Sequence, residues 1–127
     1  MAVKGGTAAD AFAFGAFFTS KDTVDGGDGT DTVRLDGGNF LLATAESTKG
    51  MNAFVSVENV NFTGATGANI DQTTLTNSSI TKFIFDTGGN DTVANANGTT
   101  VFATGTANAG NETFALKAGN TTLNLAL

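Results

Sequence analysis

The sequence predicts an all-β protein built as a β-solenoid, in which short strands stack in successive turns. Short apolar segments recur along the chain, each closed by Gly, Asn or Asp, and from Val60 onward their centres are about ten residues apart. Glycine and asparagine fill the gaps, where tight corners need left-handed backbone, and abundant Ala and Thr permit close stacking of turns. A β-sandwich is the alternative interpretation.

The alternation of apolar segments with turn residues predicts the following elements in chain order. Strands are predicted at 32–35, 54–57, 60–62, 82–85 and 100–102, and further apolar centres lie at Ile70, Ile80, Val93, Phe114 and Leu123. Residues 39–47 (NFLLATAES) have the composition of a short helix or helical turn. No proline and no Ser/Gly tract divides the chain, so a single domain, 1–127, is expected.

Composition excludes several classes of function. Twelve acidic residues against six basic ones give a net charge of -6, which argues against a nucleic-acid partner. Cys and His are absent, so thiol, imidazole and zinc-site chemistry are excluded. A non-enzymatic role is expected, because the remaining catalytic option is a carboxylate pair such as Asp22/Asp25 or Asp28/Asp31, and these residues fit better as metal ligands.

The sequence also predicts a chain that does not insert into a membrane. No apolar run approaches the ~20 residues that a spanning helix needs. The N-terminal segment MAVKGGTAAD lacks the apolar core of a cleavable signal peptide.

One segment carries a metal-binding pattern. Residues 26–34 (GGDGTDTVR) fit G-G-x-G-x-D-x-U-x at every fixed position, the calcium-binding nonapeptide of RTX proteins. Its glycines open a turn with inward carbonyls, Asp31 supplies a carboxylate, and Val33 anchors the next strand. Calcium takes about six to eight such oxygens. The predicted calcium positions in this turn are Gly26, Gly27, Asp28, Gly29 and Asp31.

A single nonapeptide cannot complete a calcium shell, so a second turn must contribute. Residues 5–12 match the same pattern except that Ala8 replaces a glycine. Turns on the same side of a β-roll recur about every eighteen residues, and Asp10 precedes Asp31 by this spacing plus about three inserted residues. The calcium site is therefore predicted to bridge turns 5–10 and 26–31. A bare acidic turn without metal is the alternative.

The remaining aspartates of this region are weaker candidates. Asp22 and Asp25 are expected on the opposite side of the solenoid, with Asp36, before Gly37 and Gly38, as a candidate ligand there. The later fragments around Asp91 and Glu112 depart from the pattern, and for them a structural role is favoured over metal binding. On this interpretation residues 1–38 are the calcium-binding turns and 39–127 the stacked strands.

The segment GGDGTDTVRLDGG (26–38), followed by VSVENVNFTG (55–64), resembles bacterial RTX-type surface-layer proteins. The resemblance implies an RTX-like β-roll or parallel β-helix that leaves the cell by type I secretion with an uncleaved C-terminal signal. It further implies that the protein folds with Ca²⁺ outside the cell and self-associates into a lattice on the cell surface. The motif match implies calcium-site positions at Gly26, Gly27, Gly29 and Asp31. Asp10 matches the motif less closely.

Calcium dependence also has a physical basis in the sequence. Five aspartates between positions 22 and 36, offset only by Lys21 and Arg34, repel one another when turns stack, and a divalent cation converts that repulsion into attraction. The alternating leucines of 123–127 predict an edge strand for self-association. Two alternatives remain: an adhesin or biofilm-matrix module with a cell-surface polysaccharide as partner, and a non-catalytic RTX module of a larger secreted protein.

Overall fold

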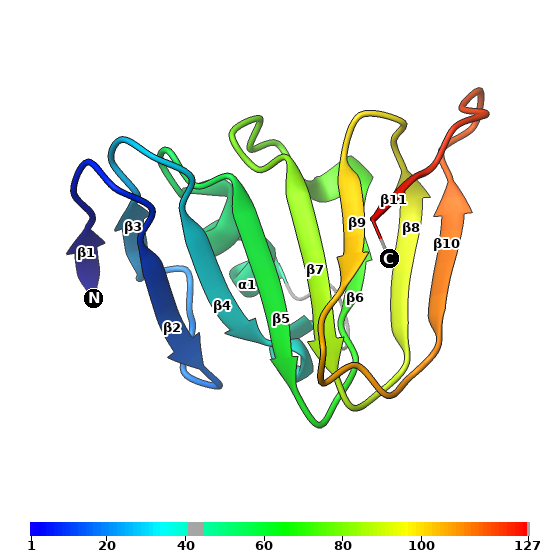
Figure 1. Cartoon of the computed structure of the whole chain (residues 1–127), viewed down its shortest axis with the longest axis horizontal. Coiled ribbons are helices and arrows are strands. Elements are labelled where there is room, and N and C mark those ends of the chain that lie inside the picture. The colour runs from blue at the N-terminus through cyan, green and yellow to red at the C-terminus, as the bar shows by residue number, and fades with distance from the viewer. Residues whose placement is uncertain (41–44, 127) are drawn as a thin grey trace.

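The computed structural model describes residues 1–40 and 45–126, and it shows a β-solenoid of about five turns (Figure 1). Every strand pairing is parallel. This confirms the predicted all-β solenoid. It excludes the sandwich alternative, whose sheets are antiparallel.

The elements alternate between two faces of the solenoid. The strands are β1 (Ala2–Lys4), β2 (Ala11–Gly15), β3 (Thr23–Asp25), β4 (Thr32–Asp36), β5 (Asn59–Gly64), β6 (Asn69–Asp71), β7 (Lys82–Thr87), β8 (Asp91–Ala96), β9 (Val101–Thr104), β10 (Glu112–Leu116) and β11 (Asn124–Ala126). The helical segments are η1 (Gly37–Phe40), α1 (Ala45–Asn52) and η2 (Gln72–Thr74).

One face is a continuous sheet and the other is interrupted. The continuous sheet has six strands in the order β11-β9-β7-β5-β4-β2, and the opposite face holds the sheets β10-β8-β6 and β1-β3. Each turn of the solenoid contributes one strand to each face, except the turn before β5, which has no strand on the interrupted face. The connections between strands therefore lie along two edges of the solenoid. Turns 5–10 and 26–31 lie at the edge where the strands of the six-stranded sheet begin.

Phenylalanines stacked between the faces form the centre of the core. Because parallel strands pair in register, residues on one face of each strand lie directly over one another. Phe62 stacks on Phe83 and on Phe85, with ring centroids 5.9 and 5.7 Å apart. Phe102 continues the stack beside Phe83 at 6.2 Å. All four rings are buried, and the ladder fixes the relative positions of successive turns.

The chain between β4 and β5 departs from the predicted pattern. Where the sequence predicts a strand at 54–57, the structure has a single bridge, between Val55 and Asp25, because η1 and α1 occupy most of this connection. The helix expected at 39–47 lies further along, at Ala45–Asn52, and residues 41–44 fall outside the described residues. Met51 and Phe54 are buried, so this segment closes the core where a strand is missing.

Two further apolar centres lie outside the strands. Ile80 is buried in the connection before β7, and Leu123 is partly buried immediately before β11. Across residues 1–40 and 45–126, no helix has the length and apolar character to cross a membrane.

Candidate metal centre

The two glycine-rich turns of the predicted site lie directly on one another. Strand β2 pairs with β4 in the register Ala11↔Thr32, which places turn 5–10 on turn 26–31. The backbone N–H of Asp28 donates to the Gly6 carbonyl at 3.0 Å, so the tips of the turns are joined as well. The predicted pairing of these two turns is therefore confirmed.

Oxygen atoms crowd against glycines in both turns. A Cβ on Gly26 would lie 2.0 Å from the Ser56 carbonyl oxygen and 2.4 Å from Asp31 Oδ2. A Cβ on Gly5 would lie 2.0 Å from the Gly26 carbonyl oxygen and 2.6 Å from Asp10 Oδ2. Each glycine thus leaves room for one carbonyl and one carboxylate oxygen, the two kinds of ligand that calcium prefers.

A ladder of carboxylates runs across three successive turns at this edge. The Asp10 N–H donates to Asp31 Oδ1 at 2.7 Å, and the Asp31 N–H donates to Glu58 Oε2 at 2.8 Å. Asp31 and Glu58 therefore each accept from the equivalent residue of the preceding turn. Glu58 is not among the predicted ligands, although it shares a local signal with Asp10 and Asp31. Each acid stands directly before a strand whose first residue is small or polar and whose second is apolar.

Asp31 is fully buried, and its second oxygen has no partner. Its exposed fraction is 0%, and Oδ2 is a buried atom that accepts no hydrogen bond. The comparison with Asp10 explains why: Asp10 Oδ2 accepts from the Gly6 N–H at 2.7 Å, but the equivalent Gly27 N–H donates to Asp25 Oδ1 at 3.1 Å. A buried, unpaired carboxylate oxygen is costly, and a cation is the group that would satisfy it.

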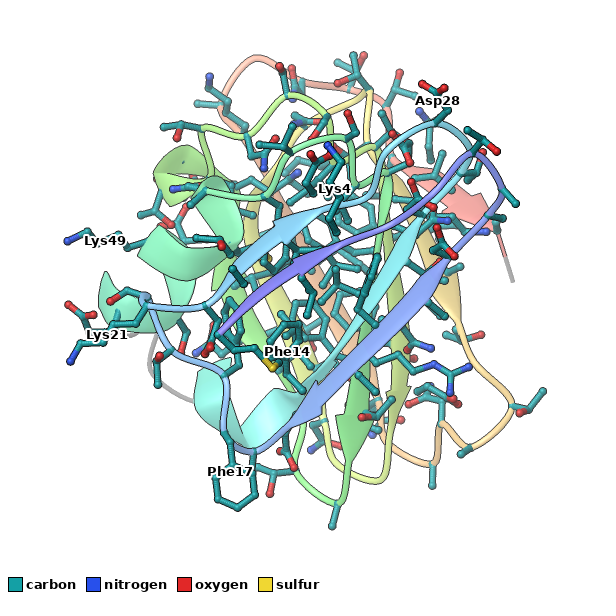
Figure 2. The ribbon with its side chains drawn as sticks, turned by 90° about the vertical axis from the view of Figure 1, so that its left-hand side faces the viewer. Lys4, Phe14, Phe17, Lys21, Asp28 and Lys49 are labelled. Atoms are coloured by element: carbon teal, nitrogen blue, oxygen red, sulfur yellow. The ribbon has the colours of Figure 1, made fainter. Side chains whose placement is uncertain are left out.

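The other predicted ligands lie apart from this centre. The side chain of Asp28 is exposed at the tip of its turn and points into solvent (Figure 2). Asp36 stands at the far end of β4, where its Oδ1 accepts from the Gly38 N–H at 2.8 Å. The structure therefore does not bring Asp28 or Asp36 to the oxygens around Gly26.

Asp22 and Asp25 have charged partners of their own. The N-terminal amine lies 2.8 Å from Asp22 Oδ1, and its hydrogen bond lowers the pKa of Asp22. Lys4 Nζ lies 2.7 Å from Asp25 Oδ2, and this bond lowers the pKa of Asp25. The expectation that both face the opposite side is wrong for Asp25: it ends β3 directly before Gly26, so it lies at the same edge as Asp31.

The donor set at this edge is carboxylate plus backbone carbonyl. Among the described residues no three acidic side chains gather closely enough to hold a metal by themselves. A cation here would be bound by Asp10 and Asp31, with carbonyl oxygens such as those of Gly26 and Ser56 completing the ligands. Calcium accepts backbone carbonyls readily, whereas zinc favours Cys and His side chains.

The turn before β8 offers a contrast. The Ala68 N–H donates to Asp91 Oδ1 at 2.6 Å, as the Asp10 N–H does to Asp31, but here the Thr87 hydroxyl donates to Oδ2 at 2.9 Å. Burial raises the pKa of Asp91. Both of its oxygens are paired, which fits the structural role favoured for Asp91 from the sequence.

Comparison of the chain with models of known families, with curated proteins and with solved structures found no match.

Proposed function

We propose that this chain is a calcium-dependent structural and self-assembly module of a secreted bacterial surface-layer protein. The observation that carries the calcium part is the buried Oδ2 of Asp31, which has no hydrogen-bond donor and lies against Gly26 beside the Ser56 carbonyl. The residues present fit calcium, since every candidate ligand is a hard oxygen. The resemblance of residues 26–38 and 55–64 to RTX-type surface-layer proteins supports the cellular role.

Calcium at this position would couple the first turns of the solenoid to the rest. Asp10, Asp31 and Glu58 belong to three successive turns. Asp31 and Glu58 each accept a backbone N–H from the preceding turn, whereas Asp10 accepts from Gly6 of its own turn. Without a cation, three negative charges at one edge repel one another. With a cation bound, the same charges hold the turns together, so folding becomes linked to the calcium concentration outside the cell.

Calorimetric titration of the chelated 127-residue protein with calcium tests the proposal. We expect binding with a dissociation constant of about 10⁻⁴ to 10⁻³ M, as in extracellular calcium modules. Asp31→Ala should weaken it about tenfold or more, which corresponds to ~1.4 kcal/mol. Light scattering of the same samples should show growth in mass with calcium.

Asp86→Asn is the matched control. Asp86 is the second-last residue of β7, at the other edge, where its Oδ1 accepts from the Ala107 N–H at 2.6 Å. The substitution removes one negative charge but no oxygen of the proposed site, so calcium affinity should stay within about twofold of the wild type. A wild-type protein that binds no calcium at millimolar concentration would rule the proposal out.

A groove on the solenoid supports a second candidate function, that of an adhesin module. It has a volume of about 340 Å³ and is lined by uncharged side chains, with hydroxyl and amide groups above Ile80 and Phe83. Its walls are tied together, because Gln72 Nε2 donates to Thr100 Oγ1 at 3.0 Å and Gln72 Oε1 accepts from the Asn97 N–H at 2.7 Å. A neutral sugar suits such a lining. Binding of neutral oligosaccharides to a monomeric protein that does not grow in mass with calcium would favour this candidate.

A further inference from the structure

Both ends of the solenoid present unpaired strand edges. Within the described residues, β1 pairs only with β3 and β2 only with β4, while at the other end β10 pairs only with β8 and β11 only with β9. Figure 1 shows these ends at opposite sides of the molecule, with β1 and β2 on the left and β10 and β11 on the right. Each end therefore offers two parallel edges, one on each face.

Apolar side chains that are covered inside the solenoid are open at its ends. Along one row the register runs Phe12↔Val33↔Val60↔Phe83↔Phe102↔Leu125. The inner members of the row are buried, but Phe12 is only partly buried and Leu125 is 46% exposed. Figure 2 looks onto the first end and shows Phe14 between the foremost strands, pointing toward the interior. Within the described residues, the row is therefore uncovered at both of its ends.

The two ends complement each other in register. Ala11 and Asn124 occupy the same level of the six-stranded sheet, since the register runs Ala11↔Thr32↔Asn59↔Lys82↔Val101↔Asn124. One more step of the same pattern places Asn124 of one copy beside Ala11 of another. The Leu125 of the first copy then covers Phe12 of the second, and both apolar ends become buried.

Hydrogen-bonding groups at the ends also match. Inside the molecule the Asp10 N–H donates to Asp31 Oδ1, and the Thr32 N–H donates to the Asp10 carbonyl at 2.9 Å. Leu123 is the equivalent of Asp10 in the last turn, and Ala11 is the equivalent of Thr32 in the first. Placed end to end, the Leu123 N–H faces the Asp10 carboxylate, and the Leu123 carbonyl faces the Ala11 N–H.

We infer that copies of this chain associate end to end, with β10 and β11 of one copy paired in parallel against β1 and β2 of the next. The inference rests on the proposed self-assembly and names its contact surface. A second solenoid of the same strand direction offers a matching pair of parallel strand edges, one on each face. Because the two surfaces differ, the contact is heterologous and propagates into open chains of molecules.

Disulfide trapping tests this contact, because the natural chain has no cysteine. Ala13 and Ala126 are exposed and lie at one level of the sheet, so in the proposed contact they face each other across adjacent strands ~4.8 Å apart, within disulfide range. The double variant Ala13→Cys/Ala126→Cys should give a ladder of disulfide-linked oligomers under mild oxidation in millimolar calcium. Each single variant should stay monomeric on a non-reducing gel.

The pair Ala11→Cys/Ala126→Cys is the matched control. It is shifted by two residues along the strand, which separates the two Cα atoms by about 8 Å and prevents a disulfide. A ladder from this pair equal to that of Ala13→Cys/Ala126→Cys would overturn the proposed register. Dimers of Ala13→Cys alone would overturn the end-to-end arrangement in favour of pairing between identical ends.

A second variant separates this inference from the calcium proposal. Leu125→Lys places a charge opposite Phe12 of the next copy and leaves the turns 5–10 and 26–31 untouched, so it should abolish the growth in mass while calcium binding by calorimetry stays unchanged. Calcium binding without any disulfide ladder in the double variant would overturn the contact alone. Loss of calcium binding in the wild type would overturn the proposed function instead.

Discussion

Asp31→Asn distinguishes a metal ligand from an ordinary turn residue, because the two roles predict opposite effects on stability. In the protein without metal, Oδ2 of Asp31 is buried without a donor, and both it and the Ser56 carbonyl oxygen lie within 2.4 Å of the position that a Cβ on Gly26 would take. An asparagine keeps an oxygen to accept from the Asp10 N–H and places an N–H₂ donor where Oδ2 stood. The substitution should therefore stabilise the calcium-free protein.

The magnitude follows from the cost of the unpaired oxygen. Leaving a buried polar group unsatisfied costs about 1–3 kcal/mol, so the calcium-free variant should gain about 1–2 kcal/mol in free energy of unfolding. For a chain of this size that corresponds to ~4 °C in melting temperature per kcal/mol. Calcium at a hundredfold excess over its dissociation constant should stabilise the wild type by ~2.7 kcal/mol, and the variant by less than ~1 kcal/mol.

Urea unfolding followed by far-ultraviolet circular dichroism measures both effects, once in chelator and once in calcium at a hundredfold excess over its dissociation constant. Asp28→Asn is the control, because it removes the same charge from an exposed side chain of the same turn. Asp28→Asn should change neither the free energy of unfolding in chelator nor the stabilisation by calcium by more than ~0.5 kcal/mol. The reasoning is refuted if Asp31→Asn is less stable than the wild type in chelator, or if calcium stabilises it as much as the wild type.

Three further predictions concern the turns and the core. Gly26→Ala places a Cβ 2.0 Å from a carbonyl oxygen and should cost more than ~2 kcal/mol in thermal unfolding, whereas Gly88→Ala, with its nearest contact at 3.4 Å, should be nearly neutral. Burial raises the pKa of Asp91, so its neutral form stabilises the fold below about pH 4 and this stabilisation is lost as the pH rises through the raised pKa. Asp91→Asn should remove that slope from urea unfolding as the pH rises above about 4, and equal slopes would contradict the assignment. Phe85→Ala should cost about 3–5 kcal/mol, because the ring is fully buried, while Phe17→Ala, 87% exposed, should cost less than ~0.5 kcal/mol by the same assay.

Local chemistry explains which parts of the fold could be predicted. Strand punctuation by glycine, asparagine and aspartate is a short-range property, so the solenoid and most strands follow from it. The nonapeptide at 26–34 and its partner at 5–10 share a turn pattern, and one short insertion separates them. Their stacking, with Asp10 beside Asp31, could therefore be predicted.

Contacts across long insertions could not be predicted in the same way. Glu58 follows Asp31 by 27 residues, and the helical segment between them hides its equivalence from any repeat spacing. Residues 54–57 have strand composition, yet the packing of Met51 and Phe54 into the core leaves a single bridge at Val55.

The sequence by itself determined the kind of fold, the location of the acidic turns and the pairing of the first two of them, because these depend on residues close together in the chain. Only the tertiary structure decided which carboxylate is left without a donor. Asp25 and Asp31 both end up at one edge, and Asp25 takes the Gly27 N–H that would otherwise satisfy Asp31 Oδ2. That competition depends on two turns brought together in space, and no spacing in the sequence encodes which acid accepts the bond.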